Sequence, residues 1–287
     1  MISSTVLTKI LQQLGQEGGE VEVLKGATSS LVLRVGEGIL RVHTNQDWLH
    51  EEPDLVLHEV FALQAAGDLA PDVLDYQTGV KDEVPPWLYM TRSPGEIRLD
   101  QVDEQYVERL AQMLAAIHAL PVPESRYVYQ PYATERHVPT WTQHPERWRQ
   151  LLAVEPEPDE SQTIRFIHRD FHPVNVLYEM NGTCHTIDWI NACVGPIEVD
   201  LAHCRLNLAL LESVEMADHF LKSYLKQTKR SYDHAWDIRA IFDFGPETID
   251  VYPGWKAYGR QNLSQDNVRE RLEKFVLKVY ENNESGY

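Results

Sequence analysis

Residues 163–200 read TIRFIHRDFHPVNVLYEMNGTCHTIDWINACVGPIEVD. In this stretch apolar residues lead into His168-Arg169-Asp170, and Asn175 follows shortly after. The pair Asn181-Gly182 favours a tight turn between two short strands, and Asp188 ends the returning strand. We therefore expect one small hairpin and its approach loop to bring three oxygen-bearing side chains together, those of Asp170, Asn175 and Asp188.

Phosphoryl transfer is the chemistry that needs such a set. A carboxylate orients the accepting hydroxyl and takes its proton, and this role is predicted for Asp170. An amide oxygen and a second carboxylate suit Mg2+, so Asn175 and Asp188 are the predicted metal ligands. The alternative is a metal-free pair of carboxylates, as in glycoside hydrolysis. That alternative leaves Asn175 and the N-terminal sheet without a role.

The N-terminal third has mainly β character. Apolar residues at helical spacing predict a first helix over residues 2–14, and alternation predicts three short strands between residues 20 and 43. Two more strands are predicted at residues 69–74 and 87–90. A helix between Asp54 and Gly67 carries Glu59 on its apolar stripe, and a carboxylate in that place needs a partner.

The rest of the chain is mostly helical. A helix is predicted over residues 102–120, with His118 facing inward as a hydrogen-bonded core residue. Residues 121–162 lose the pattern and are predicted as loop with short helices. A break at residues 91–95 separates the two parts. The fold class is thus α+β, with a small, mainly antiparallel β N-lobe (1–91) and a larger, mostly helical C-lobe (92–287).

Composition excludes several classes of protein. The 287 residues are 43% hydrophobic, which excludes a disordered chain, and a net charge of −18 argues against nucleic acid as the main partner. The sequence shows no signal peptide and no membrane span, so we expect a cytoplasmic protein without a membrane partner. The 3 cysteines fit reduced thiols in the interior better than a metal–thiolate site. The sequence leaves the oligomeric state open.

The longer string HRDFHPVNVL…IDW…GPIEVDLA resembles the aminoglycoside phosphotransferase and choline kinase family, where the loop typically reads H-G-D-x-H-x-x-N. The resemblance covers nearly the whole chain and implies a protein-kinase-like two-lobe fold. It also implies a Mg2+-dependent enzyme that transfers the γ-phosphate of ATP or GTP to a hydroxyl of a small molecule. In such an enzyme Asp170 is the catalytic base, Asn175 and Asp188 bind the metal, and Asp200 braces the catalytic loop.

The resemblance also implies a nucleotide site in the N-lobe. Arg41 falls where the family places a base against the phosphates, and Glu59 falls where a helix carboxylate pairs with that base. Met90 and Arg92 fall on the segment that would meet the adenine. The phosphate loop would consist of Gly26, Thr28, Ser29 and Ser30.

Three positions depart from the family pattern. Arg41 replaces Lys, Arg169 replaces the usual Gly, and the phosphate loop has one glycine. The chain lacks G-x-G-x-x-G and A-P-E, and the predicted metal ligand Asp188 is followed by Trp189 and not by Phe-Gly, which argues against a protein kinase. Arg41 and the sparse loop keep open a second hypothesis, a nucleotide-binding pseudokinase with a regulatory role.

The acceptor is not fixed by the resemblance. Trp236, Asp237, Asp243 and Glu247 combine aromatic faces with carboxylates, which would suit an ammonium group. An aminoglycoside-like or other amine-bearing alcohol is therefore one hypothesis for the acceptor. An ordinary solvated acidic surface is the alternative interpretation of the same residues.

Overall fold

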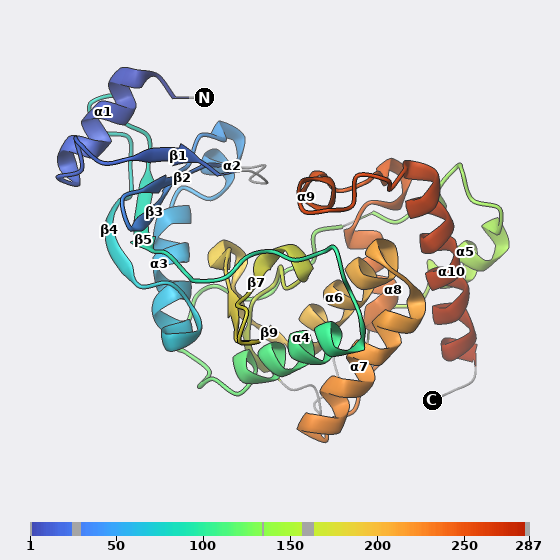
Figure 1. The fold of residues 1–287 in the computed structure, drawn as a ribbon. Helices are drawn as coiled ribbons and strands as arrows, with labels where there is room; N and C mark the ends of the chain where they lie inside the picture. The colour runs from blue at the N-terminus through green and yellow to red at the C-terminus, as the bar shows by residue number, and fades with distance from the viewer. Residues whose placement is uncertain (1, 25–29, 134, 157–163, 285–287) are drawn as a thin grey trace. The chain divides into compact units, whose positions relative to one another are not determined.

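The computed structural model describes residues 2–24, 30–133, 135–156 and 164–284 (Figure 1). The chain divides into two compact units. The first comprises Met1–Pro94 and His185–Asn191, and the second comprises Gly95–Cys184 and Ala192–Tyr287. The lobe boundary expected from the sequence, after residue 91, assigns residues 185–191 to the C-lobe. In the structure these residues belong to the first unit. No helix among the described residues is long and apolar enough to cross a membrane.

The first unit contains a five-stranded antiparallel sheet with the order β1-β2-β3-β5-β4. Its strands are β1 (Val21–Val23), β2 (Leu31–Val35), β3 (Gly38–Val42), β4 (Val73–Gln77) and β5 (Trp87–Thr91). The strand predicted at residues 69–74 is wrong at its start. A 3-10 turn, η1 (Gly67–Leu69), comes first, and Pro71 has no N–H to donate to a ladder, so β4 begins at Val73.

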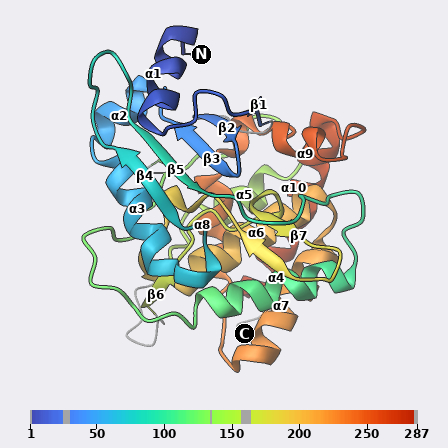
Figure 2. The same cartoon turned by 60° about the vertical axis from the view of Figure 1, so that its left-hand side comes forward.

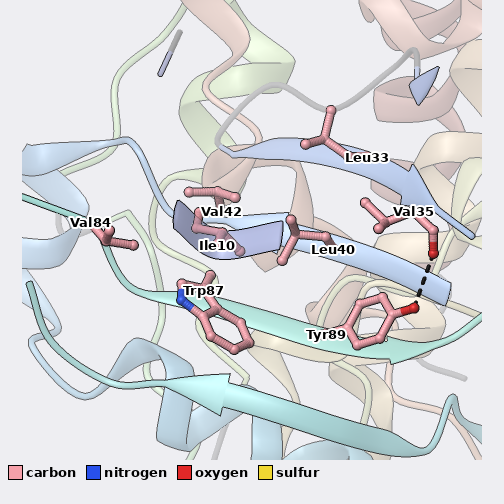
Figure 3. Close-up of a cluster of buried hydrophobic side chains, with 8 residues drawn as sticks. All are labelled: Ile10, Leu33, Val35, Leu40, Val42, Val84, Trp87 and Tyr89. Atoms are coloured by element: carbon pink, nitrogen blue, oxygen red, sulfur yellow. Dashed lines mark hydrogen bonds between the residues drawn. The ribbon is translucent and has the colours of Figure 1, made fainter. Parts of the chain in front are cut away.

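Alternation along the strands gives the sheet two different faces. One face carries Leu33, Leu40 and Trp87, which pack against Ile10 of helix α1 (Ser4–Gln13), as Figure 3 shows. The hydroxyl of Tyr89 ends this core by donating to the carbonyl oxygen of Val35 at 3.0 Å. The predicted first helix and first three strands are therefore confirmed.

The opposite face carries Arg41, which pairs in register with Val32 and Leu88. Helix α3 (Leu55–Ala66) contacts strands β4 and β5 and the short helix η3 (Trp189–Asn191). A further helix, α2 (Gln46–Glu51), was not predicted; Asn45 caps it by accepting from the N–H groups of Asp47 and Trp48.

The second unit is mostly helical. Its described helices are α4 (Glu104–Ile117), α5 (Pro145–Leu151), α6 (Ile197–Leu211), α7 (Val214–Thr228), α8 (Ala235–Asp243), α9 (Pro253–Ala257) and α10 (Gln265–Glu284), with 3-10 turns η2 (Pro173–Asn175) and η4 (Pro246–Thr248). Helices α4 and α7 lie side by side (Figure 2). Helix α6 is almost wholly buried because it packs against α7, α8 and α10.

Short strands carry the loop that the sequence singled out. Strand β6 (Ile164–Ile167) pairs antiparallel with β9 (Cys193–Pro196), so the segment between them starts and ends at one place. Within that segment β7 (Val176–Tyr178) and β8 (Cys184–Thr186) form the predicted hairpin. With the antiparallel sheet and the helices, the fold is α+β, as predicted.

The cysteines are free thiols. Cys193 and Cys204 are buried, as expected, whereas Cys184 is half-buried. Burial raises the pKa of Cys193 to about 12, so its thiol stays protonated. The metal-ligand cluster found among the described residues contains no cysteine.

Candidate functional site

In the first unit, Arg41 of β3 joins two carboxylates. Its Nε atom lies 3.3 Å from Oε1 of Glu59 on α3, and its Nη1 atom donates to Oδ1 of Asp188 at 2.7 Å. The Arg41 and Glu59 side chains are 9% and 1% exposed, whereas that of Asp188 is 36% exposed. The partner expected for the buried Glu59 is therefore present, and the same guanidinium also orients Asp188.

Burial and charge shape the titration of this cluster. Burial alone would lower the pKa of Arg41, but the charges of Asp188 and Glu59 raise it overall. Burial raises the pKa of Glu59 to about 7, which Arg41 counters only in part. His43 lies 3.7 Å from Glu59, and burial together with the Arg41 charge lowers its pKa to about 3. His43 is therefore neutral near pH 7.

The other residues predicted for the nucleotide site are placed as follows. Met90 lies on β5 opposite Ile39, on the same sheet face as Arg41, and Arg92 is exposed just beyond that strand. Ser30 immediately precedes β2. Gly26, Thr28 and Ser29 lie outside the described residues. Asp188 has a φ of 66°, a left-handed backbone conformation that non-glycine residues rarely adopt and that is common at functional sites.

In the second unit, Asp200 at the start of α6 holds the loop after β6. Its Oδ2 atom accepts from the backbone N–H of His168 at 2.8 Å, and its Oδ1 atom accepts from that of Arg169 at 2.7 Å. The Nε2 atom of His118 lies 3.1 Å from the same carboxylate, and its Nδ1 atom bonds to the hydroxyl of Tyr224. The inward, hydrogen-bonded position predicted for His118 is confirmed.

Asp170, half-buried at the tip of this loop, is surrounded by two histidines and an asparagine amide. Its Oδ1 atom lies 3.1 Å from Nε2 of His203 and 3.7 Å from Nε2 of His172. Asn175 donates through Nδ2 to the backbone oxygen of Asp170 at 2.9 Å and to its Oδ2 atom at 3.2 Å. Burial alone would raise the pKa of Asp170, but His172 and His203 lower it overall, so the carboxylate is ionised.

One set of ligand atoms in the second unit could hold a cation. Ligand atoms of Asp170, His172 and His203 lie within 4.8 Å of one another, and imidazole suits transition metals. Mg2+ prefers oxygen, which Asn175 and Asp188 supply. Because Asn175 donates through Nδ2 to Asp170, its Oδ1 atom is the one that could face a cation. Taken separately, the oxygen ligands of Asn175 in the second unit and of Asp188 in the first unit are of the type that suits the predicted metal.

A cavity of about 220 Å³ is bordered by Arg169, which precedes Asp170 in the chain, and by His203, which contacts the Asp170 carboxylate. Aromatic side chains and further charged groups complete its wall: Tyr129, Tyr132, Trp236, Arg239, Asp243 and Phe244. The sequence prediction missed His203, Tyr129, Tyr132 and Arg239. Trp236 and Asp243, which the sequence analysis considered for the acceptor, do lie in this wall, and the Arg at position 169, where the family pattern has Gly, was a further signal.

The carboxylates proposed for an ammonium group already have partners. Asp237 is fully buried, and its Oδ1 atom accepts from Nε of Arg205 at 2.9 Å, so it belongs to no solvated surface. Glu247 accepts from the N–H and hydroxyl of Thr140. Asp243 lies in the cavity wall between two arginines, 3.3 Å from Arg239 and 3.8 Å from Arg169.

Comparison with solved structures shows which fold this is. The chain resembles choline kinase LicA from Streptococcus pneumoniae, with 16% identity, 97% of this chain and 98% of that chain covered and a TM-score of 0.63. It also resembles amicoumacin kinase hAmiN in complex with AMP-PNP, Ca2+ and Ami, with 16% identity, coverage of 98% and 94% and a TM-score of 0.62. A third similar structure is aminoglycoside phosphotransferase APH(3'')-Id from Streptomyces rimosus. It shares 16% identity, with 90% of this chain and 99% of that chain covered and a TM-score of 0.56.

At identities this low, the structural likeness shows the kinase-like fold that these proteins share, and it shows the fold alone. No curated protein matches the chain. The model of one protein family, described as the phosphotransferase enzyme family, matches residues 20–236. This match covers more than half of the chain and includes the catalytic loop, the hairpin and Asp188. The chain therefore belongs to the phosphotransferase enzyme family.

Proposed function

We propose that this phosphotransferase moves the γ-phosphate of ATP or GTP to a hydroxyl group of a small molecule, with Asp170 as the catalytic base. The observation that supports this assignment is the state of Asp170. Its carboxylate is ionised, fixed by Asn175 and His203, and carried on a loop that Asp200 braces. A carboxylate that is already deprotonated and oriented can accept the hydroxyl proton as the oxygen attacks phosphorus.

Arg41, Asp188 and Asn175 have the chemistry for the donor side of the reaction. Arg41 carries a permanent charge and planar donors suited to phosphate oxygens. Asn175 and Asp188 would hold Mg2+, which when bound neutralises phosphate charge. The net charge of −18 supports a small-molecule acceptor over a nucleic acid.

Thermal unfolding tests the nucleotide part of this proposal. At about 100 times its dissociation constant, Mg-ATP or Mg-GTP should stabilise the protein by about 2.7 kcal/mol, a rise in Tm of roughly 5 °C or more. Asp188→Asn should lose the metal-dependent part of that rise. If neither nucleotide changes the Tm of the wild type, the proposed donor is wrong.

Transfer of labelled phosphate to a panel of small alcohols tests the catalytic part. Asp170→Asn should keep the nucleotide-induced rise in Tm while transfer falls by at least about a hundredfold, the contribution of a positioned base. Transfer that survives in Asp170→Asn would refute the assignment of the base. A wild type that binds nucleotide but transfers to nothing would favour the pseudokinase hypothesis.

A further inference from the structure

The backbone of Arg169 has a conformation that glycine would adopt more easily. Its φ is 72°, in the left-handed region where a Cβ atom is crowded. The family pattern, with Gly at this position, fits the same backbone without strain. A large side chain kept at a strained position beside Asp170 calls for a functional explanation.

The guanidinium of Arg169 is buried but incompletely paired. The side chain is 6% exposed, and its guanidinium carbon lies 4.7 Å from the ring centroid of Tyr129 and 3.9 Å from that of Tyr132. Its Nη2 atom donates to the carbonyl oxygen of Gln130 at 3.1 Å and lies 3.8 Å from Asp243. A guanidinium has five N–H donors, so the described residues use a minority of them.

The guanidinium of Arg169 lines the cavity of about 220 Å³, and the carboxylate of Asp243 in the same wall already has partners. Asp243 accepts from the backbone N–H of Ala133 at 2.9 Å and pairs with Arg239 at 3.3 Å. Arg239 also lies 3.5 Å from Glu155, an exposed carboxylate that Arg136 shares at 2.7 Å. The unused capacity in the described cavity wall is therefore that of hydrogen-bond donors: those of Arg169, with the buried Nε of Arg239 and Nε1 of Trp236, neither of which has a hydrogen-bond partner.

We propose that the cavity binds an anionic group of the acceptor, a carboxylate or a phosphate, with Arg169 as its anchor. The inference rests on the proposed function and names its substrate class: a small alcohol that carries a negative charge. With the anion held by Arg169, the neighbouring Asp170 meets the acceptor hydroxyl. The hydroxyl proton passes to Asp170, and the hydroxyl oxygen forms a bond to the γ-phosphorus. The bond from the γ-phosphorus to the nucleoside diphosphate breaks.

Size and charge both disfavour an amine-rich sugar as the occupant. A volume of about 220 Å³ lies below the roughly 300–1,000 Å³ typical of pockets for drug-sized ligands. An ammonium group would meet Asp243 only by displacing arginine partners. Tyr129 and Tyr132 stack on Arg169 and hold its plane, which leaves the edge donors to recognise a planar or tetrahedral anion.

The test uses four probes of similar size: glycerate, glycerol 3-phosphate, glycerol and 3-amino-1,2-propanediol. Their binding is measured by calorimetry on the full chain, with and without a non-hydrolysable ATP analogue. At least one of the two anions should bind about tenfold to one-hundredfold more tightly than glycerol, as expected for a charge-assisted contact. The tighter of the two then distinguishes a carboxylate from a phosphate.

Arg169→Gly is the decisive variant because glycine fits the backbone that Arg169 strains. It should weaken binding of the anions about tenfold to one-hundredfold and leave glycerol binding and the nucleotide-induced rise in Tm unchanged. Arg149→Gln is the matched control, since it removes an exposed arginine that pairs with Glu146 on α5. The control should bind the anions as the wild type does.

The outcomes separate this inference from the proposed function. If the protein binds nucleotide and transfers phosphate, but prefers glycerol or the amine, the anion site is refuted and the phosphotransferase stands. Equal weakening of all four probes in Arg169→Gly would also refute it. If anions bind through Arg169 while no nucleotide binds, the anion site stands and the proposed donor fails.

Discussion

The Nε2 atom of His203 on α6 lies 3.1 Å from the Oδ1 atom of Asp170. On the same helix, Nδ2 of Asn207 donates to the backbone oxygen of His203 and lies 3.2 Å from Nε2. One nitrogen cannot both donate to Asp170 and accept from Asn207, so the contact with Asp170 requires the proton on Nε2. Helix α6 thus carries a ring that can donate to the proposed base. His203 is a positioning residue for Asp170 in this arrangement, and it also borders the cavity.

Replacing His203 by Ala should lower kcat while leaving nucleotide binding intact. A misplaced catalytic group costs up to about a hundredfold in rate, so a fall in kcat of about tenfold to one-hundredfold is expected. His203→Gln, which keeps a donor at similar reach, should recover part of it. Steady-state kinetics give kcat and the KM for nucleotide separately.

A matched control for this histidine is His219→Ala. His219 on α7 forms a similar pair with Glu108, at 3.2 Å, but lies outside the Asp170 cluster. It should keep wild-type kcat. An equal loss of kcat in both variants, or a loss of the nucleotide-induced rise in Tm in His203→Ala, would mean general damage to the unit.

Asp200→Asn should destabilise the second unit and disable the loop. The wild-type carboxylate accepts two backbone N–H groups and bonds to His118, all in a fully buried place. An amide can accept on one side only, so at least one buried donor loses its partner. The expected cost is about 2–4 kcal/mol in the free energy of unfolding, measured by denaturant titration. An unchanged free energy of unfolding would show that the loop does not depend on this brace.

Arg205 allows a direct comparison of a buried and an exposed ion pair. Its Nε atom lies 2.9 Å from Asp237, which is fully buried, and its Nη2 atom lies 3.2 Å from Asp218, whose side chain is 42% exposed. Asp237→Asn should cost about 3–5 kcal/mol because Arg205 stays buried without its main counter-charge. Asp218→Asn should cost about 1 kcal/mol or less. Equal costs in denaturant titrations would contradict this difference.

The pH dependence of the same pair has a definite sign. Burial alone would raise the pKa of Asp237, but Arg205 and His234 lower it overall. A carboxyl group with a lowered folded-state pKa stabilises the fold above its ordinary pKa of about 4, and that stabilisation falls as the pH drops further. The difference in free energy of unfolding between wild type and Asp237→Asn should therefore be present at pH 5 and shrink below about pH 4.

Local patterns were enough to predict the hairpin after residue 175 and much of the sheet. The adjacent pair Asn181-Gly182 signals the turn of this hairpin, and a buried carboxylate such as Glu59 requires a partner in any fold. The cavity depended on contacts that no local pattern contains. It brings Tyr129, from a segment without periodicity, against Arg239 on α8 and Arg169 after β6. Two sequence signals point to this cavity. One is Arg169, a side chain where glycine is usual, and the other is the pattern of aromatic residues and carboxylates that singled out Trp236 and Asp243, which lie in its wall.

Arg41 provides the last prediction, because it serves both a buried carboxylate and Asp188. Arg41→Lys should keep the fold but weaken binding of metal–nucleotide by about tenfold, since one ammonium cannot span both partners as a planar fork does. Arg41→Met leaves Glu59 buried without its counter-charge. This variant should unfold more readily by about 3–5 kcal/mol at pH 8.

The cost of Arg41→Met should shrink toward pH 5. Burial already raises the pKa of Glu59 to about 7 beside Arg41, and removing that positive charge raises it further. A carboxyl group with a raised folded-state pKa is neutral in the fold at pH 5, so no charge is buried there. As the pH rises through that pKa, the fold must bury the ionised carboxylate, and the free energy of unfolding falls. Adding Glu59→Gln should restore stability at pH 8. If the double variant is as unstable as Arg41→Met, then lost packing of the arginine, and not the isolated charge of Glu59, explains the defect.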